Sequence, residues 1–247
     1  MSSGAMEFES IRWDFGHLPA SLVFSWAVWA GIIVVSIIVA KNKKLVPGRV
    51  QAVFEMLFEF VCNLADELIG PHAYRFYPLF IGLFFFILVG NLIGFIPGLM
   101  SPTSDPNLTF GLALLVFVYF VFIGFRYNGI GYLKQFRGPK LPWYMFPISL
   151  LISVTEIISF FTRPLSLGLR LFCNIFSKEL FLGILAWLML EFLLSPVITD
   201  KLFFSPVMLF MRPAIMLLGL IIAFIQALVF MVLSMSYIAG AVHMEEH

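Results

Sequence analysis

Long apolar runs without charged residues alternate with short polar segments along almost the whole chain. Residues 18–40 and 76–104 contain no formal charge, and a third apolar run fills residues 107–125. About 20 consecutive apolar residues are enough for an α-helix to cross a hydrocarbon core of about 30 Å. The pattern therefore predicts membrane spans at about 18–40, 76–100 and 107–125.

The second half of the chain contains two helical patterns that are too long for upright spans. They cover about 143–191, which is roughly 70 Å of α-helix, and about 203–242. Pro147 and Pro164 allow kinks, so the first pattern is either two spans joined by a tight turn or one bent, tilted helix. Because no polar turn interrupts residues 165–176, we favour the tilted helix.

Residues 50–68 show a different pattern, in which acidic side chains stand between apolar ones at helical spacing. This predicts an amphipathic helix that lies either on the inner membrane face or against other helices. Its acidic residues favour contact with protein. The expected fold is all-α, with one membrane domain over residues 1–247. It comprises about five membrane helices, the last two long and strongly tilted, and an amphipathic helix after the first span.

Composition supports a membrane protein and excludes several other classes. Hydrophobic residues make up 61% of the chain and charged residues 12%, whereas soluble domains are closer to half apolar and a quarter charged. The net charge of +1 gives no indication of nucleic-acid binding. Cys62 and Cys173 lie far apart in helical patterns, so neither a disulfide nor a metal site is expected, and no cofactor is predicted.

Lysine and arginine residues predict the orientation of the chain in the membrane. The loops at 41–49 and 126–140 contain four each, whereas the turn at 101–107 contains none. Because basic loops remain on the cytoplasmic side, we expect the N-terminus outside and the C-terminus in the cytoplasm. The first apolar run follows an acidic segment and is too long for a signal peptide. No transit peptide is evident, which favours a bacterial plasma (inner) membrane.

Before Glu191 at its end, five charged residues interrupt the apolar pattern of residues 143–191. A charge at the centre of a span costs about 2.5–3.5 kcal/mol, so such residues usually face protein or water and mark ion or substrate paths. Alternatively, they form ion pairs that hold helices together. The five are Glu156, Arg163, Arg170, Lys178 and Glu179.

Arg170 lies at the centre of a polar stripe on this expected helix. At 100° per residue, Arg163 lies within about 20° of it, and Glu156 and Asn174 lie within about 40°. Glu179 lies on nearly the opposite face, about 13 Å toward the outer side, while Glu156 lies about 21 Å toward the cytoplasm. Because arginine does not give up its proton, this layout is the one expected of two half-channels separated by a fixed positive charge.

The last helix contributes one further polar candidate. Gln226 is the only large polar side chain between Arg212 and Ser234. It is either a hydrogen-bonding residue between two helices or a partner of Arg170, and its spacing leaves both roles open.

The sequence around Arg170 resembles subunit a of F-type ATP synthases, and other segments of the chain match that family too. Residues 163–174 read Arg-Pro, then Ser-Leu-Gly-Leu-Arg-Leu-Phe, and end on Asn, and a glutamate stands nine residues after the arginine. This segment is highly specific, and together with the other matches it appears in the family's order over nearly the whole chain. They are Asn91–Gly98, Pro102–Asn107, Gln226-Ala227 and the ending Glu245-Glu246-His247.

The resemblance implies a stator subunit of the membrane sector that has no catalytic activity of its own. Such a subunit lies beside the c-ring, a rotating ring of proteolipids that each carry a carboxylate in the membrane, and it contacts the peripheral-stalk subunit b. ATP chemistry takes place on other subunits. Arg170 matches the arginine that attracts the ring carboxylate into its ionised form and blocks a proton leak between the half-channels.

The resemblance also implies roles for other polar residues. Asn174, Glu179 and Gln226 match positions of the outer inlet or of the support for the arginine. Glu156 and Ser166 match positions on the path toward the cytoplasm and near the arginine. The candidates for proton translocation are therefore Arg170, Glu179, Asn174, Gln226, Glu156 and Ser166.

Three positions depart from the family pattern. Cys173 replaces a glycine and is expected to widen the helix interface slightly. Lys178 stands where relatives have a small or acidic residue, and it should favour an ionised Glu179 unless it turns outward to the membrane surface. Some relatives have a histidine or an acid at Gly219, so the inlet is expected to depend more on Glu179 and on water.

Two other functions suit a polytopic membrane protein. A secondary transporter or channel that works alone predicts repeated halves with discontinuous helices, and the sequence contains no convincing repeat. A membrane-embedded enzyme predicts a catalytic motif, but H-E-x-x-H, a nucleophile elbow and a phosphate loop are all missing from the sequence. A neighbouring reading frame for a two-span protein with one mid-helix carboxylate would decide for the stator.

Overall fold

The structure, a computed structural model, describes residues 20–41, 48–96, 99, 101–132, 146–194 and 198–242. The regular elements of these residues are helices: α1 (Ala20–Lys41), α2 (Arg49–Ile69), η1 (Ala73–Arg75), α3 (Tyr77–Ile93), η2 (Pro102–Ser104), α4 (Pro106–Asn128), α5 (Phe146–Leu194) and α6 (Ile198–Val242). Four of these helices, α1, α4, α5 and α6, are long and apolar enough to cross a membrane, and α3 is a shorter apolar helix. The expectation of an all-α membrane protein is confirmed.

Two helix ends differ from those expected. α3 ends at Ile93, well before residue 100, because Gly94 and Pro97 disfavour a continued helix. α6 begins at Ile198, a few residues before the expected start near 203. The consequence is a short α3 followed by a separate polar segment that carries η2.

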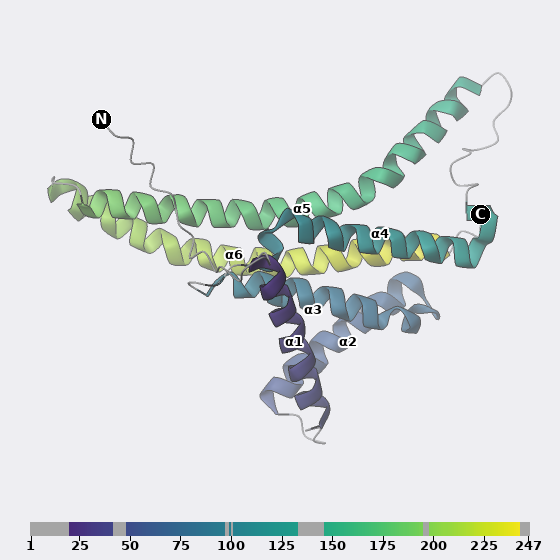
Figure 1. Ribbon diagram of the computed structural model, residues 1–247, viewed down its shortest axis with the longest axis horizontal. Helices are drawn as coiled ribbons and strands as arrows, with labels where there is room; N and C mark the ends of the chain where they lie inside the picture. The colour runs from purple at the N-terminus through teal and green to yellow at the C-terminus, as the bar shows by residue number, and fades with distance from the viewer. Residues whose placement is uncertain are drawn as a thin grey trace.

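α5 is one continuous helix of 49 residues, which corresponds to about 74 Å. It has no turn between residues 165 and 176, so the alternative of two spans is wrong for this segment. Pro164 lies inside the helix, where it removes one backbone hydrogen bond and permits a bend. In Figure 1 the N-terminal part of α5 bends away from α4.

The two long helices lie side by side and form a layer with α4. α5 packs along α6, α4 packs against both, and α3 packs against α6. In Figure 1 α1 crosses the direction of α5 and α6 at a steep angle. The two long helices therefore do not run parallel to α1.

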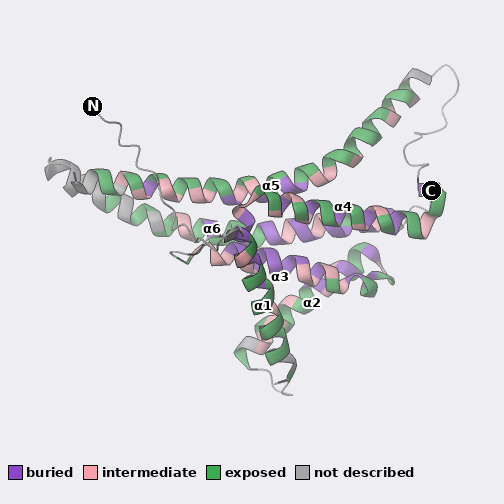
Figure 2. Cartoon of the chain, viewed as in Figure 1, coloured by how far each residue is buried: buried purple, intermediate pink, exposed green. Residues whose placement is uncertain are grey.

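Buried residues concentrate where α3, α4 and α6 meet, whereas much of α5 and α1 is exposed (Figure 2). The central side chains are mostly phenylalanines at 1% exposure or less, including Phe80, Phe84, Phe120 and Phe230. The amphipathic helix α2 packs against α3 and α6, so it makes the expected contact with protein. An exposed α5 beside a well-packed core leaves a face of the molecule available to a partner.

Candidate functional site

Arg170 lies on the exposed face of α5, not in the packed core. It lines an open hollow of about 450 Å³ whose other walls also come from α5. No carboxylate in the described part of the chain forms an ion pair with Arg170. An unpaired charge in a membrane is costly, and the described part of the chain supplies Arg170 with no counter-charge. The other lining residues of the hollow are Thr162, Leu165, Ser166, Leu169 and Cys173.

Asn174 and Gln226 join α5 to α6 beside this face. The Asn174 side-chain amide donates a hydrogen bond to Oε1 of Gln226 at 2.6 Å. Gln226 is 3% exposed, and its Nε2 is buried with no hydrogen-bond partner among the described residues. The sequence left Gln226 either as a hydrogen-bonding residue between helices or as a partner of Arg170, and the structure shows the first of these. The two N–H donors of the Gln226 amide have no acceptor among the described residues.

Arg163 lies in a different environment from Arg170, although the two are seven residues apart on similar faces. It is partly buried, and its guanidinium carbon lies 5.4 Å from the centre of the Tyr237 ring on α6. This is a cation–π contact. The sequence analysis missed Tyr237. The spacing along the sequence could have identified it, because Tyr237 follows Gln226 by eleven residues, about three helical turns, and so lies on a similar face of α6.

Glu179 is partly buried on the other side of α5, where the segment η2 packs against this helix. The Ser104 hydroxyl of η2 donates a hydrogen bond to the backbone carbonyl of Ser101 at 2.7 Å. The sequence analysis matched this turn, Pro102–Asn107, to the family and did not single out Ser104.

A buried polar network holds this loop against α3 and α6. The Ser101 hydroxyl donates to the Gly90 carbonyl at 2.9 Å, and the Thr103 hydroxyl donates to Oδ1 of Asn91 at 2.6 Å. The side-chain amide of Asn91 donates to the Ala223 carbonyl at 3.4 Å. Because these groups satisfy one another away from solvent, the loop beside Glu179 is fixed in place.

Lys178 turns into the protein and does not reach outward. Its Nζ lies 4.1 Å from the centre of the Phe95 ring and is buried with no hydrogen-bond partner among the described residues. Gly219 makes room for this chain, because a Cβ there would lie 3.1 Å from Cδ of Lys178. A desolvated cation–π contact contributes about 2 kcal/mol. The alternative of an outward-turned lysine is therefore wrong, and a lysine fills the space at Gly219.

Two further positions from the sequence analysis lie apart from these contacts. Glu156 is exposed on α5, about four turns before Arg170, and shares no hydrogen bond or ion pair with the other described candidates. Cys173 is exposed on the Arg170 hollow, and the slightly wider helix interface expected there stays a prediction. Ser166 lines the same hollow as Arg170, near the arginine as expected.

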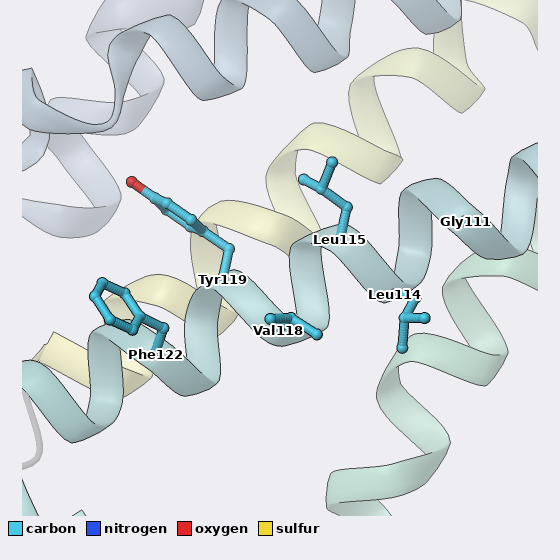
Figure 3. A pocket seen from close by; sticks show the side chains of 6 residues that line it. All are labelled: Gly111, Leu114, Leu115, Val118, Tyr119 and Phe122. Carbon is cyan, nitrogen blue, oxygen red and sulfur yellow. The ribbon is translucent and has the colours of Figure 1, made fainter.

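A second hollow, of about 530 Å³, lies on α4. Figure 3 shows apolar side chains along it, with the Tyr119 hydroxyl as its one polar side-chain group. Without a charged residue, it offers nothing that could carry a proton or pair with an ion. Its lining is Gly111, Leu114, Leu115, Val118, Tyr119 and Phe122.

Comparisons with known proteins cover the whole region of the site. The chain matches the family described as ATP synthase A chain over residues 22–239. ATP synthase subunit a of Sulfurihydrogenibium sp. (strain YO3AOP1) is 40% identical over 214 residues, which is 87% of this chain and 92% of the relative. That of Aquifex aeolicus (strain VF5) is 39% identical over 237 residues, 95% of this chain and 100% of the relative. That of Trichlorobacter lovleyi is 37% identical over 221 residues, 90% and 86% of the two chains.

Proposed function

The chain belongs to the family of ATP synthase A chains, and from this premise we propose that Arg170 separates two aqueous half-channels at the surface of the c-ring. The family forms the proton channel of the F-type membrane sector and is not itself catalytic. The chain is accordingly a multi-pass inner-membrane protein that works with the c-ring.

The observation that carries the proposal is the exposure of Arg170 without a carboxylate partner in the described chain. A ring carboxylate that reaches the hollow supplies that partner. Two unit charges 4 Å apart attract by about 4 kcal/mol at an effective dielectric constant of 20, which favours the ionised carboxylate over the protonated one. By stabilising the ionised form, the guanidinium promotes release of the proton from the ring carboxylate. It keeps its own proton and therefore does not carry a proton itself.

The other candidates divide between the two sides of the arginine. On the outer side, Glu179 exchanges protons with water. Asn174 holds the side-chain amide of Gln226, whose free N–H groups point toward water or the ring carboxylate. On the cytoplasmic side, Ser166 and Glu156 line the path out. The orientation with the N-terminus outside and the C-terminus in the cytoplasm belongs to this proposal, as does subunit b as the stalk partner. Both termini lie outside the described residues.

The test is the substitution Arg170→Ala in the assembled ATP synthase. We expect proton-driven ATP synthesis to fall at least about 100-fold, because removing one partner of a desolvated ion pair costs about 3–5 kcal/mol. Arg163→Ala is the matched control, since this arginine has its own contact with Tyr237. It should retain most of the synthesis rate. Normal synthesis in the Arg170→Ala enzyme, with assembly verified by subunit content, would refute the proposal.

A further inference from the structure

Arg75 in η1 is an exposed arginine whose guanidinium is oriented by two tyrosine hydroxyls. Its Nε donates a hydrogen bond to the hydroxyl of Tyr74, and its Nη1 donates to that of Tyr127 on α4, both at 3.2 Å. Asp66 of α2 accepts a hydrogen bond from the Tyr77 hydroxyl, and no described carboxylate forms an ion pair with Arg75. Because arginine has five N–H groups and stays charged, most of its donors remain open to an anion.

The apolar hollow on α4 extends toward this arginine. It runs from Gly111 to Phe122, which is about 16 Å along the helix. The Tyr119 ring lies at the Phe122 end of the hollow, and its hydroxyl points away from Gly111 (Figure 3). This ring packs edge-on against Phe76, the residue after Arg75, with the ring centres 6.4 Å apart. The hollow and the guanidinium therefore adjoin each other on the C-terminal part of α4.

A long apolar hollow beside an unpaired cation matches the two parts of an anionic phospholipid. A planar guanidinium binds phosphate oxygens through paired N–H donors, and tyrosines are enriched at the boundary of the hydrocarbon core. Tyr127 follows Phe122 by five residues, about 8 Å of helix, which leaves room for a glycerol with its ester groups. An apolar helix from another subunit would fill the hollow but leave the cation without a partner.

We propose that the hollow on α4 and Arg75 together bind one anionic phospholipid. An acyl chain lies along the hollow, the Tyr119 hydroxyl donates to an ester carbonyl, and the free N–H groups of Arg75 donate to the phosphate. Arg170 lies on a different helix, α5, and takes no part in this site. The proposed role of Arg170 is therefore independent of whether the lipid binds.

The test uses the assembled membrane sector in phosphatidylcholine nanodiscs that contain a trace of phosphatidylglycerol with a photoreactive group at the end of one acyl chain. After illumination, peptide mass spectrometry should find the label on α4 between residues 111 and 122. The same photoreactive chain on phosphatidylcholine, whose headgroup has no net charge, should label this segment at least about fivefold less. Equal labelling by the two lipids overturns the inference. So does the absence of label on α4, which is the result expected if a helix of another subunit fills the hollow.

Two substitutions test the two ends of the site in sectors whose subunit content is verified. Arg75→Gln should lower the labelling at least about fivefold, the contribution of one basic residue beside anionic lipid. The matched control is Arg126→Gln, which removes the same charge from another exposed arginine near the end of α4 and should leave the labelling unchanged. An equal loss in both variants overturns the inference, because it assigns the effect to surface charge in general.

Gly111→Leu tests the apolar end. A Cβ at Gly111 meets nothing within 4 Å, so the larger side chain fits the fold and fills part of the hollow. It should displace the acyl chain and reduce the label on residues 114–122. Undiminished labelling of this segment would overturn the placement of the chain in the hollow.

Discussion

Arg170 and Glu179 lie on opposite sides of α5 and differ in how far their own chain surrounds them. Arg170 is exposed on a hollow formed by its own helix, and no described carboxylate pairs with it. Glu179, nine residues later, is partly buried on the side where η2 packs against α5, and the polar groups of that loop are bonded to one another and to α3. Among the described residues, the glutamate is thus partly enclosed by its own chain, whereas the arginine has no counter-charge.

This difference follows from what each residue must do in the proposed cycle. A carboxylate that exchanges protons with water needs fixed neighbours in both of its charge states. An arginine that meets one ring carboxylate after another needs an open approach, because a partner in its own chain would compete with each of them. The comparison therefore predicts large effects of Arg170 on synthesis and graded effects around Glu179.

The largest of the remaining effects is expected at Glu179. Glu179→Gln removes the group that exchanges protons on the outer side, so we expect proton uptake from that side to slow by at least about 100-fold, the lower end of the range for loss of one acid–base group. The measurement is passive proton flux into vesicles that contain the membrane sector. The control is Glu191→Gln, an exposed glutamate near the end of the same helix, which should leave the flux unchanged. Equal flux in both variants would remove Glu179 from the path.

A smaller effect is expected where Lys178 fills the space at Gly219. Gly219→Ala places a methyl group 3.1 Å from both Lys178 and Phe95, so the lysine or the ring must move. We expect a loss of about 1–3 kcal/mol in stability, measured as a lower midpoint of thermal unfolding of the purified membrane sector. In the control Gly183→Ala, the new methyl group meets nothing within 4 Å, so that change should be neutral or stabilising. Similar midpoints for both variants would contradict the packing of Lys178.

The smallest effect is expected for the bond between Asn174 and Gln226. A double-mutant cycle with Asn174→Ala and Gln226→Ala should show a coupling of about 0.6 kcal/mol, the typical value for a hydrogen bond between membrane helices. The same unfolding midpoint provides the measurement. Strict additivity of the two substitutions would mean that the 2.6 Å bond does not join α5 to α6 in the assembled sector.

The sequence predicted the parts of this account that depend on one helix at a time. The absence of a polar turn in residues 165–176 predicted a continuous α5, and helical spacing placed Arg163 and Arg170 on similar faces of it. These inferences need only helical periodicity. The position of each charged residue along α5 was therefore available before the fold was known.

The contacts between helices were beyond the sequence. The inward turn of Lys178 depends on the space at Gly219 on another helix, and the packing around the Glu179 side of α5 depends on the segment η2. Tyr237 beside Arg163 is a similar case. Each of these joins residues at least 40 positions apart in the chain, as the printed sequence shows, and helical periodicity carries no information about them.

The central claim is that the c-ring covers the hollow of Arg170. The thiol of Cys173, which lies in this hollow, makes the claim testable by cross-linking. Cys173 is exposed in that hollow. In the other cysteine, Cys62 on α2, burial and the nearby Asp66 raise the pKa of the thiol, so less of it is reactive thiolate at a given pH. The measurement is mild oxidation of the assembled ATP synthase with cysteines introduced one at a time around the ring carboxylate. A disulfide requires Cα atoms within about 7 Å.

The account predicts a disulfide between Cys173 and a ring cysteine within one helical turn of the carboxylate. It should persist in Cys62→Ser and disappear in Cys173→Ser. Failure of every such ring position to form the bond, in enzyme whose ring cysteines still react with a small thiol reagent, would contradict the placement of the ring on this face of α5.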